Sequence, residues 1–123
     1  MAFRILIVDD NRSFLEAARV LLERQGLSVV GVALTGAEAL SQAEQLQPDL
    51  ILVDIMLGEE SGFELARDLI EQDHGGGTSV ILISTHAEAD FADLIADCPA
   101  SGFLPKSELS ADAIAQILNG LPR

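Results

Sequence analysis

The sequence predicts an α/β fold: a doubly wound, five-stranded parallel sheet with five flanking helices. Short, nearly continuous apolar segments alternate along the chain with segments whose apolar residues repeat at helical spacing. This alternation favours parallel strands, because parallel strands need crossover connections and crossover helices cover both faces of a sheet. The 123 residues, 49% hydrophobic and 22% charged, have the size and composition of one globular domain, which we expect to span residues 1–123.

Five segments have the composition of strands. The runs 3–8, 50–53 and 80–83 are rich in β-branched residues, as in strands that are buried on both faces. The runs 28–33 and 102–104 are less apolar or shorter, so we expect them at the two edges of the sheet. Placing the three most apolar strands in the interior gives the strand order 2-1-3-4-5.

Five stripes of apolar residues at helical spacing lie between and after these strands. They are Phe14, Ala17, Ala18, Leu21 and Leu22; Ala37, Leu40, Ala43 and Leu46; Phe63, Ala66, Leu69 and Ile70; Phe91, Leu94, Ile95 and Cys98; and Ile114, Ile117, Leu118 and Leu121. Thr35 with Glu38, and Ser61 with Glu64, have the spacing of a capping box, which predicts helix starts at these positions. Each stripe therefore predicts an amphipathic helix packed on the sheet.

The charge balance excludes several classes of partner. Acidic residues number 20 and basic residues 7, for a formal net charge of −13. Nucleic acids and anionic membranes are bound by clustered Lys and Arg, so we expect no direct nucleic-acid contact and no membrane binding. The single cysteine, Cys98, rules out a disulfide framework, and the sequence shows neither a membrane-span-length apolar run nor a signal-peptide pattern. We therefore expect a cytoplasmic protein.

Polar residues follow the predicted strands at the carboxyl edge of the sheet, where sites form in such folds. Asp9 and Asp10 follow the first strand and Asp54 follows the third, its neighbour in the predicted order. Three converging carboxylates repel one another unless a cation lies between them, and hard oxygen ligands suit Mg²⁺, with Mn²⁺ as an alternative. Ser84 ends the fourth strand, and Lys106, the only lysine, follows the fifth. A carboxylate among such groups can act as a nucleophile toward phosphorus and form an aspartyl phosphate.

Four segments, in this order, resemble a known family. They are Ile5–Asn11; Leu50–Leu57, with Gly62 eight residues after Asp54; Val80–Ser84; and Gly102–Lys106. Over essentially its whole length the chain resembles the receiver domain of bacterial two-component response regulators. The resemblance implies a flavodoxin-like fold and a single receiver domain over 1–123. Gly58 departs from the family pattern, in which proline is common at this position.

The resemblance also implies the chemistry of the site. Asp54 would accept a phosphoryl group from a sensor histidine kinase, a phosphotransfer protein or a small acyl phosphate. Asp9, Asp10, Asp54 and the backbone carbonyl of Met56 would hold Mg²⁺. The domain would be a signalling switch rather than an enzyme, catalysing only its own phosphoryl transfer and dephosphorylation.

The switch residues follow from the same resemblance. Ser84 would be the hydroxyl that moves toward the phosphoryl group, Lys106 would contact a phosphoryl oxygen, and Phe103 would be the aromatic side chain that rotates on activation. The face formed by the fourth helix, the fifth strand and the fifth helix, residues 88–121, would then change for partner binding or homodimerisation.

Other interpretations of the same residues remain open from the sequence. A haloacid-dehalogenase-like phosphatase also forms an aspartyl phosphate, but its nucleophilic Asp is followed two residues later by an Asp that acts as a general acid. In this chain Asn11 stands two residues after Asp9. A binding module that keeps the fold without phosphorylation would lack an acidic or lysine position, and none is lacking here. Asp10 or Asn11 could simply cap a helix, Phe103 could be a core residue and Cys98 a buried inert thiol.

Overall fold

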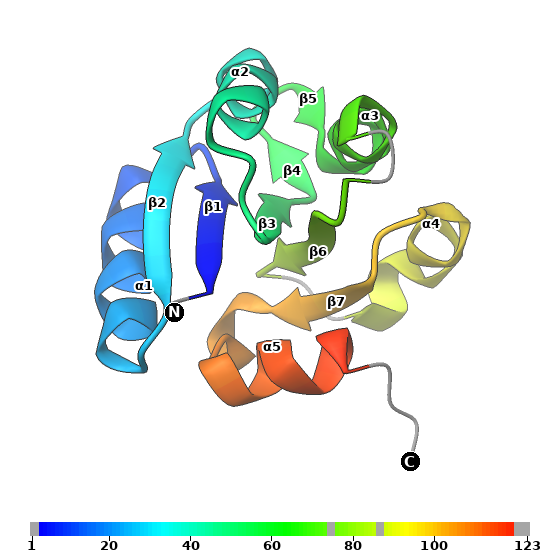
Figure 1. Ribbon diagram of the computed structural model, residues 1–123. Helices are drawn as coiled ribbons and strands as arrows, with labels where there is room; N and C mark the ends of the chain where they lie inside the picture. Colours follow the sequence, from blue (N-terminus) through cyan, green and yellow to red (C-terminus); the bar gives the residue numbers. More distant parts are fainter. Residues whose placement is uncertain (1–2, 74–75, 86–87, 120–123) are drawn as a thin grey trace.

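The computed structural model describes residues 3–73, 76–85 and 88–119 of the chain. Its centre is a parallel sheet of five strands (Figure 1), which are β1 (Arg4–Val8), β2 (Ser28–Ala33), β3 (Leu50–Asp54), β6 (Ser79–Ser84) and β7 (Gly102–Pro105). Their order is β2-β1-β3-β6-β7, and every neighbouring pair is parallel. The predicted fold class and strand order are therefore confirmed.

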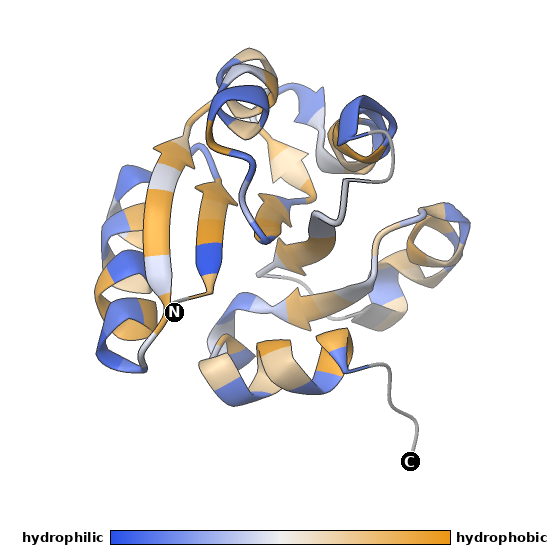
Figure 2. Cartoon of the chain, viewed as in Figure 1, coloured by the Kyte–Doolittle hydropathy of each residue, from blue (hydrophilic) through white to orange (hydrophobic). Residues whose placement is uncertain are grey.

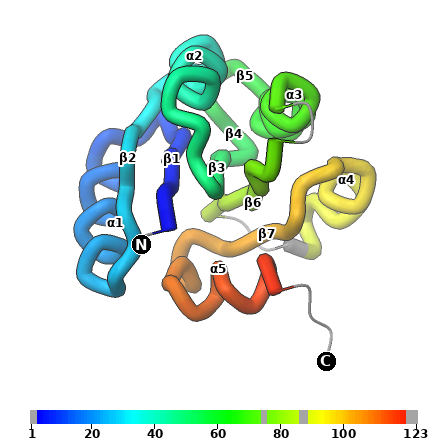
Figure 3. The backbone as a smooth tube through the Cα atoms, in the orientation of Figure 1, coloured from blue at the N-terminus to red at the C-terminus, as the bar shows by residue number. Residues whose placement is uncertain are grey.

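Five α-helices cover this sheet within the described residues. They are α1 (Arg12–Arg24), α2 (Gly36–Leu46), α3 (Gly62–Asp73), α4 (Ala92–Asp97) and α5 (Ala111–Leu118). Figure 3 shows α2, α3 and α4 along one side of the sheet and α1 and α5 along the other. Short 3₁₀ turns, Glu88–Phe91 and Lys106–Glu108, precede α4 and follow β7.

The alternation of strand side chains makes two apolar layers. Leu6 and Val8 of β1 pack in the layer that contains α2, α3 and the start of α4, whereas Ile5 and Ile7 pack against α1 and α5. The same alternation holds in the other interior strands, which are apolar along most of their length (Figure 2). Burial on both faces explains why the three interior strands appear in the sequence as continuous apolar runs.

Side-chain caps begin several helices where the sequence predicts them. The Thr35 hydroxyl accepts a hydrogen bond from the Glu38 N–H at 3.2 Å, and the Ser61 hydroxyl accepts one from the Glu64 N–H at 3.4 Å. Asn11 caps α1 by accepting from the N–H of Phe14 at 3.2 Å. These bonds satisfy backbone donors that have no partner within the helix.

Several predicted stripes differ from the structure; in α2, for example, Ala39, which the stripe omits, is buried, while Ala37 is exposed. In α1 the residues that face the sheet include Leu15, which the stripe omits, while Leu21 is 37% exposed. In α4, Leu94 is 52% exposed, whereas its neighbour Ile95 packs against the apolar layer. Leu121 of the last stripe lies outside the described residues.

A two-stranded hairpin follows the sheet strand that ends in Asp54, and the apolar pattern does not reveal it. Strands β4 (Met56–Leu57) and β5 (Glu60–Ser61) pair antiparallel through a turn that contains Gly58. Gly58 has φ +60°, which glycine adopts freely and the proline ring, fixed near −65°, does not allow.

Within the described residues, every helix is too short or too polar to cross a lipid bilayer.

Candidate functional site

Three carboxylates converge at the carboxyl edge of the sheet, as the sequence predicts. Asp9 directly follows β1 and is fully buried, and Asp54 is the last residue of β3 and is nearly so. Asp10, beside Asp9, is exposed at the rim. One oxygen from each of the three carboxylates lies within 4.8 Å of the others. Because β1 and β3 are neighbours, their carboxyl ends bring these side chains together.

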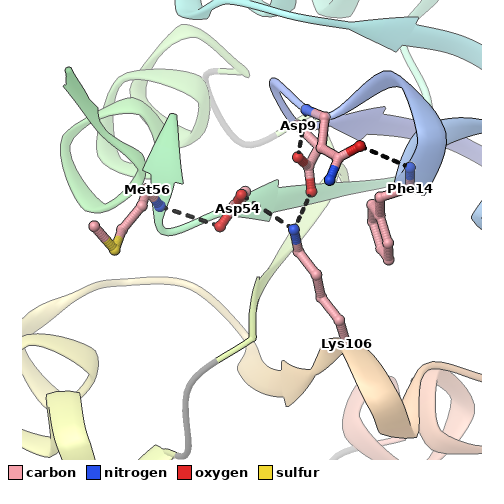
Figure 4. Close-up of polar contacts among 6 residues, drawn as sticks. Asp9, Phe14, Asp54, Met56 and Lys106 are labelled. Carbon is pink, nitrogen blue, oxygen red and sulfur yellow. Dashed lines mark hydrogen bonds and ion pairs between the residues drawn. The ribbon is translucent and has the colours of Figure 1, made fainter. Parts of the chain in front are cut away.

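Backbone donors orient the two buried carboxylates. Oδ1 of Asp9 accepts a hydrogen bond from the N–H of Asn11 at 2.9 Å, and Oδ1 of Asp54 accepts one from the N–H of Met56 at 3.1 Å. Figure 4 shows how both bonds turn the carboxylates toward the same space. In both residues the second carboxylate oxygen, Oδ2, faces other partners.

Lys106 supplies the positive charge that faces these oxygens. Its Nζ lies 2.5 Å from Oδ2 of Asp9 and 3.2 Å from Oδ2 of Asp54 (Figure 4), and its side chain is only 13% exposed. The same ammonium lies 4.3 Å from the centre of the Phe14 ring, a cation–π distance. The sequence predicts Lys106 at this edge but not its contact with Phe14, because the apolar spacing places Phe14 only on the face of a helix.

The electrostatics of the site favour a further cation. Three carboxylates share one ammonium group: Nζ of Lys106 contacts Oδ2 of both Asp9 and Asp54, which leaves a net negative charge at the site. Burial raises the pKa of the Asp54 carboxyl above its ordinary value of 3.8, and the charge of Asp9 adds to this rise. The Met56 hydrogen bond and Lys106 act in the opposite direction but do not cancel it. The oxygen donors and the uncompensated charge fit a hard divalent cation such as Mg²⁺.

Ser84 and Phe103 lie on the strands beside Asp54. Ser84 is the last residue of β6 and is buried, one position beyond Ile83, the register partner of Asp54. Phe103 of β7 is also buried and belongs to the apolar layer that contains Cys98. In this structure Phe103 is therefore a core residue, and Ser84 stands at the same sheet edge as Asp54.

Close backbone packing beneath the site depends on Gly62. A Cβ atom at this position would lie 1.9 Å from the carbonyl oxygen of Asp54 and 2.5 Å from Cα of Ile55. The Gly62 N–H donates to the carbonyl of Ile55 at 2.9 Å. The sequence shows Gly62 at its family spacing, but only the structure shows that a side chain there would displace the backbone of Asp54.

The predicted switch face is only partly described. Residues 120 and 121 lie outside the described residues, and nothing is described of the Glu88 side chain. Leu94 of α4 is the most exposed large apolar side chain on the described part of this face. Cys98 is buried beside α4, and its Sγ lies 3.9 Å from the Phe63 carbonyl.

Comparison with known proteins places the chain among signalling domains. The sequence profile of the response regulator receiver domain matches residues 5–119. The transcriptional regulatory protein YvfU of Bacillus subtilis is 33% identical over 121 residues, which cover 95% of this chain and 60% of YvfU. The chain spans about half the length of the curated relatives it matches.

Solved structures agree with the sequence comparisons. The signal receiver domain of NarL from Mycobacterium tuberculosis superimposes with a TM-score of 0.83 at 27% identity, covering 98% of each chain. A response regulator protein from Burkholderia pseudomallei, solved with a phosphorylated aspartic acid, a calcium ion and citrate, gives a TM-score of 0.78 at 27% identity. That match covers 94% of this chain and 65% of the other.

Proposed function

Because the chain belongs to the response regulator receiver domain family of two-component signal transduction, we propose that it is switched by phosphorylation of Asp54. The observation that carries this proposal is the convergence of Asp9, Asp10 and Asp54 with Lys106 at one edge of the sheet. The Burkholderia relative, which carries a phosphorylated aspartic acid and a calcium ion, supports the same chemistry. We also propose that residues 1–123 act as one receiver domain in the cytoplasm.

Asp54 is the nucleophile in this proposal. A carboxylate oxygen attacks the phosphorus of a phosphohistidine or an acyl phosphate, and the bond from phosphorus to the donor nitrogen or oxygen breaks. The leaving group keeps the bonding electron pair: a histidine nitrogen takes up a proton, whereas the carboxylate of an acyl phosphate leaves as the anion. The Met56 N–H holds Oδ1 of Asp54, which fixes the direction of the carboxylate before the donor arrives.

Asp9, Asp10, Asp54 and the backbone carbonyl of Met56 would hold Mg²⁺, with Mn²⁺ as an alternative. The bound ion would neutralise charge on the phosphoryl oxygens. The sharing of one Lys106 ammonium among three carboxylates fits this assignment. The raised pKa of Asp54 fits it too: burial of the carboxylate is its main cause, and the charge of Asp9 adds to it.

Lys106 and Ser84 would move to contact the phosphoryl group on Asp54. The Lys106 ammonium already faces Oδ2 of Asp54 and would move its contact to a phosphoryl oxygen. The Ser84 hydroxyl would move toward the phosphoryl group, and Phe103 would rotate as the face at residues 88–121 repacks. That face would bind a partner or a second copy of the chain, and the domain would make no direct contact with nucleic acid or membrane.

The phosphoryl donor would be a sensor histidine kinase, a phosphotransfer protein or a small acyl phosphate. The domain would not act on a separate substrate: its chemistry would be limited to its own phosphoryl transfer and dephosphorylation. Enzymatic or DNA-binding activity would belong to other parts of a longer protein, as the greater length of the curated relatives suggests.

Intact-mass measurement tests the proposal. The protein is incubated with acetyl phosphate and MgCl₂, with Asp54→Asn as a matched control that keeps the side-chain size. We expect one added phosphoryl group on the parent and none on Asp54→Asn, and no addition to the parent when EDTA replaces Mg²⁺. Equal phosphorylation of both proteins would overturn the assignment of Asp54.

A further inference from the structure

The hairpin that follows Asp54 is attached to helix α2 by one side chain. Oε1 of Glu60, in β5, accepts a hydrogen bond from the backbone N–H of Gly36 at 2.8 Å. Gly36 is the first residue of α2 after its cap, Thr35, so its N–H has no acceptor inside the helix. In Figure 1, β5 lies beside this end of α2. The helix leaves this N–H without a partner, and the bond to Glu60 satisfies it. The positive end of the helix dipole also attracts the Glu60 carboxylate.

The Glu60 carboxylate packs closely against Gly36, with no room for a side chain between them. Gly36 is buried, and a Cβ atom there would lie 3.1 Å from Oε2 and 3.5 Å from Oε1 of Glu60. Both oxygens of the Glu60 carboxylate therefore lie close to the Cα of Gly36. A larger residue at position 36 would push the carboxylate away from the N–H.

The hairpin borders the acidic site directly. Glu60 pairs with Leu57 across the hairpin, and the adjacent Met56 donates its N–H to Asp54. In the turn, a Cβ atom on Gly58 would lie 3.6 Å from Oδ2 of Asp10. A shift of this hairpin would therefore move the Met56 backbone and change what lies next to Asp10.

We propose that Glu60 is a positioning residue for the metal and phosphoryl site: its bond to Gly36 holds the β4–β5 hairpin, and with it the Met56 backbone, where Asp54 needs it. This inference rests on the proposed function, since it concerns the same site. Glu60 touches none of the reacting groups and acts through the backbone of the hairpin. Groups that orient metal ligands from outside typically change metal affinity when they are removed.

Four single variants isolate the bond. Glu60→Ala removes the acceptor, whereas Glu60→Gln keeps an oxygen acceptor and loses the charge. Glu59→Ala removes the same charge from the neighbouring exposed residue of the turn, outside the Glu60–Gly36 bond. Gly36→Pro removes the donor at the first helical position, where proline is accepted, and the extended backbone of Thr35 (φ −138°, ψ 166°) suits a following proline. Its ring would also displace the Glu60 carboxylate, so this variant breaks the same bond from the side of the helix.

The measurement is a Mg²⁺ titration of the ¹⁵N-labelled protein by NMR, following the Met56 amide, together with hydrogen exchange of the Gly36 amide. For Glu60→Ala we expect faster exchange at Gly36 and a dissociation constant for Mg²⁺ about tenfold higher than that of the parent. Glu60→Gln and Glu59→Ala should stay close to the parent. Gly36→Pro should weaken Mg²⁺ binding as much as Glu60→Ala, and the double variant should lose no more than either single one.

The outcomes separate this inference from the proposed function. Parent-like Mg²⁺ affinity in both Glu60→Ala and Gly36→Pro would overturn the role of Glu60 and leave the metal site intact. An equal loss of Mg²⁺ affinity in Glu59→Ala would also overturn it, because the loss would then follow from removing any nearby negative charge. Absence of Mg²⁺ binding by the parent would overturn the proposed metal site itself. If Glu60→Ala does not fold, Gly36→Pro decides the question.

Discussion

The ammonium group of Lys106 lies 3.2 Å from Oδ2 of Asp54, although Asp54 ends β3 and Lys106 follows β7, two strands separated by β6. The same ammonium reaches Oδ2 of Asp9, so one cation bridges two buried carboxylates that come from neighbouring strands. The side chain crosses the carboxyl edge of the sheet with its end over the Phe14 ring. Lys106 therefore stabilises the acidic site when no metal ion is bound.

Removing this cation should destabilise the metal-free protein. Lys106→Met keeps the apolar stem of the side chain but removes the ammonium group that faces two buried carboxylates. We therefore expect the free energy of unfolding to fall by about 3 kcal/mol at pH 7. Urea denaturation in EDTA measures it. The loss should shrink when MgCl₂ is present, and a variant as stable as the parent in EDTA would contradict the bridging role.

Asp54→Asn should stabilise the metal-free protein at neutral pH. Burial raises the pKa of Asp54 in the folded state, so between the unfolded and the folded pKa the folded state holds more protons than the unfolded chain. Stability therefore falls as the pH rises through this window, and the full cost of the buried charge is present above the folded pKa. Asn removes the charge and keeps an oxygen acceptor for the Met56 N–H.

Thermal melting in EDTA from pH 4 to pH 8 tests this sign. Asp54→Asn should melt higher than the parent at pH 7, and the difference should shrink toward the ordinary carboxyl pKa of 3.8. Glu59→Ala, which removes an exposed carboxylate from the adjacent turn, serves as the control. A lower melting temperature for Asp54→Asn at pH 7 would show that its contacts with Lys106 outweigh the cost of burial.

Mg²⁺ should raise the stability of the parent by binding only to the folded state. At a free concentration ten times the dissociation constant, the expected gain is about 1.4 kcal/mol. Asp9→Asn and Asp10→Asn should each reduce this gain, since each removes a charged ligand. The comparison uses NaCl at matched ionic strength, and an equal gain with NaCl alone would rule out a specific site.

Much of the site follows from the sequence because strand ends are predictable. Continuous apolar runs mark β1, β3 and β6, and the polar residue after each run must lie at the same edge of a parallel sheet. The ends of these strands therefore place Asp9, Asp54 and Ser84 without any structure. The strand order and the strand ends confirm these positions, while the roles of the three residues stay predictions.

The parts that the sequence misses depend on tertiary contacts. Strands of two residues, such as β4 and β5, are too short to show a periodic pattern, so the hairpin and the Glu60–Gly36 bond remain hidden. In α1 the spacing of apolar residues predicts a helix but not which side meets the sheet, and Leu15 rather than Leu21 is buried. Packing partners from other elements decide both cases.

Gly62 provides a test of the packing beneath Asp54. In Gly62→Ala the new Cβ would overlap the Asp54 carbonyl, and we expect a loss of about 3 kcal/mol in the free energy of unfolding. Gly58→Ala is the comparison, because its Cβ would make an ordinary contact of 3.6 Å with Oδ2 of Asp10 and its main cost is the left-handed backbone, about 1 kcal/mol. Equal losses in the two variants, measured by urea denaturation, would contradict the close approach at Gly62.

The most direct test of the central claim is to locate the phosphoryl group on the chain. The protein is phosphorylated with acetyl phosphate and Mg²⁺, reduced with borohydride, which converts an aspartyl phosphate to homoserine, and digested for peptide mass spectrometry. We expect homoserine at position 54 and unmodified aspartate at positions 9 and 10. Homoserine at another position, with Asp54 unchanged, would contradict the assignment of Asp54 as the phosphoacceptor.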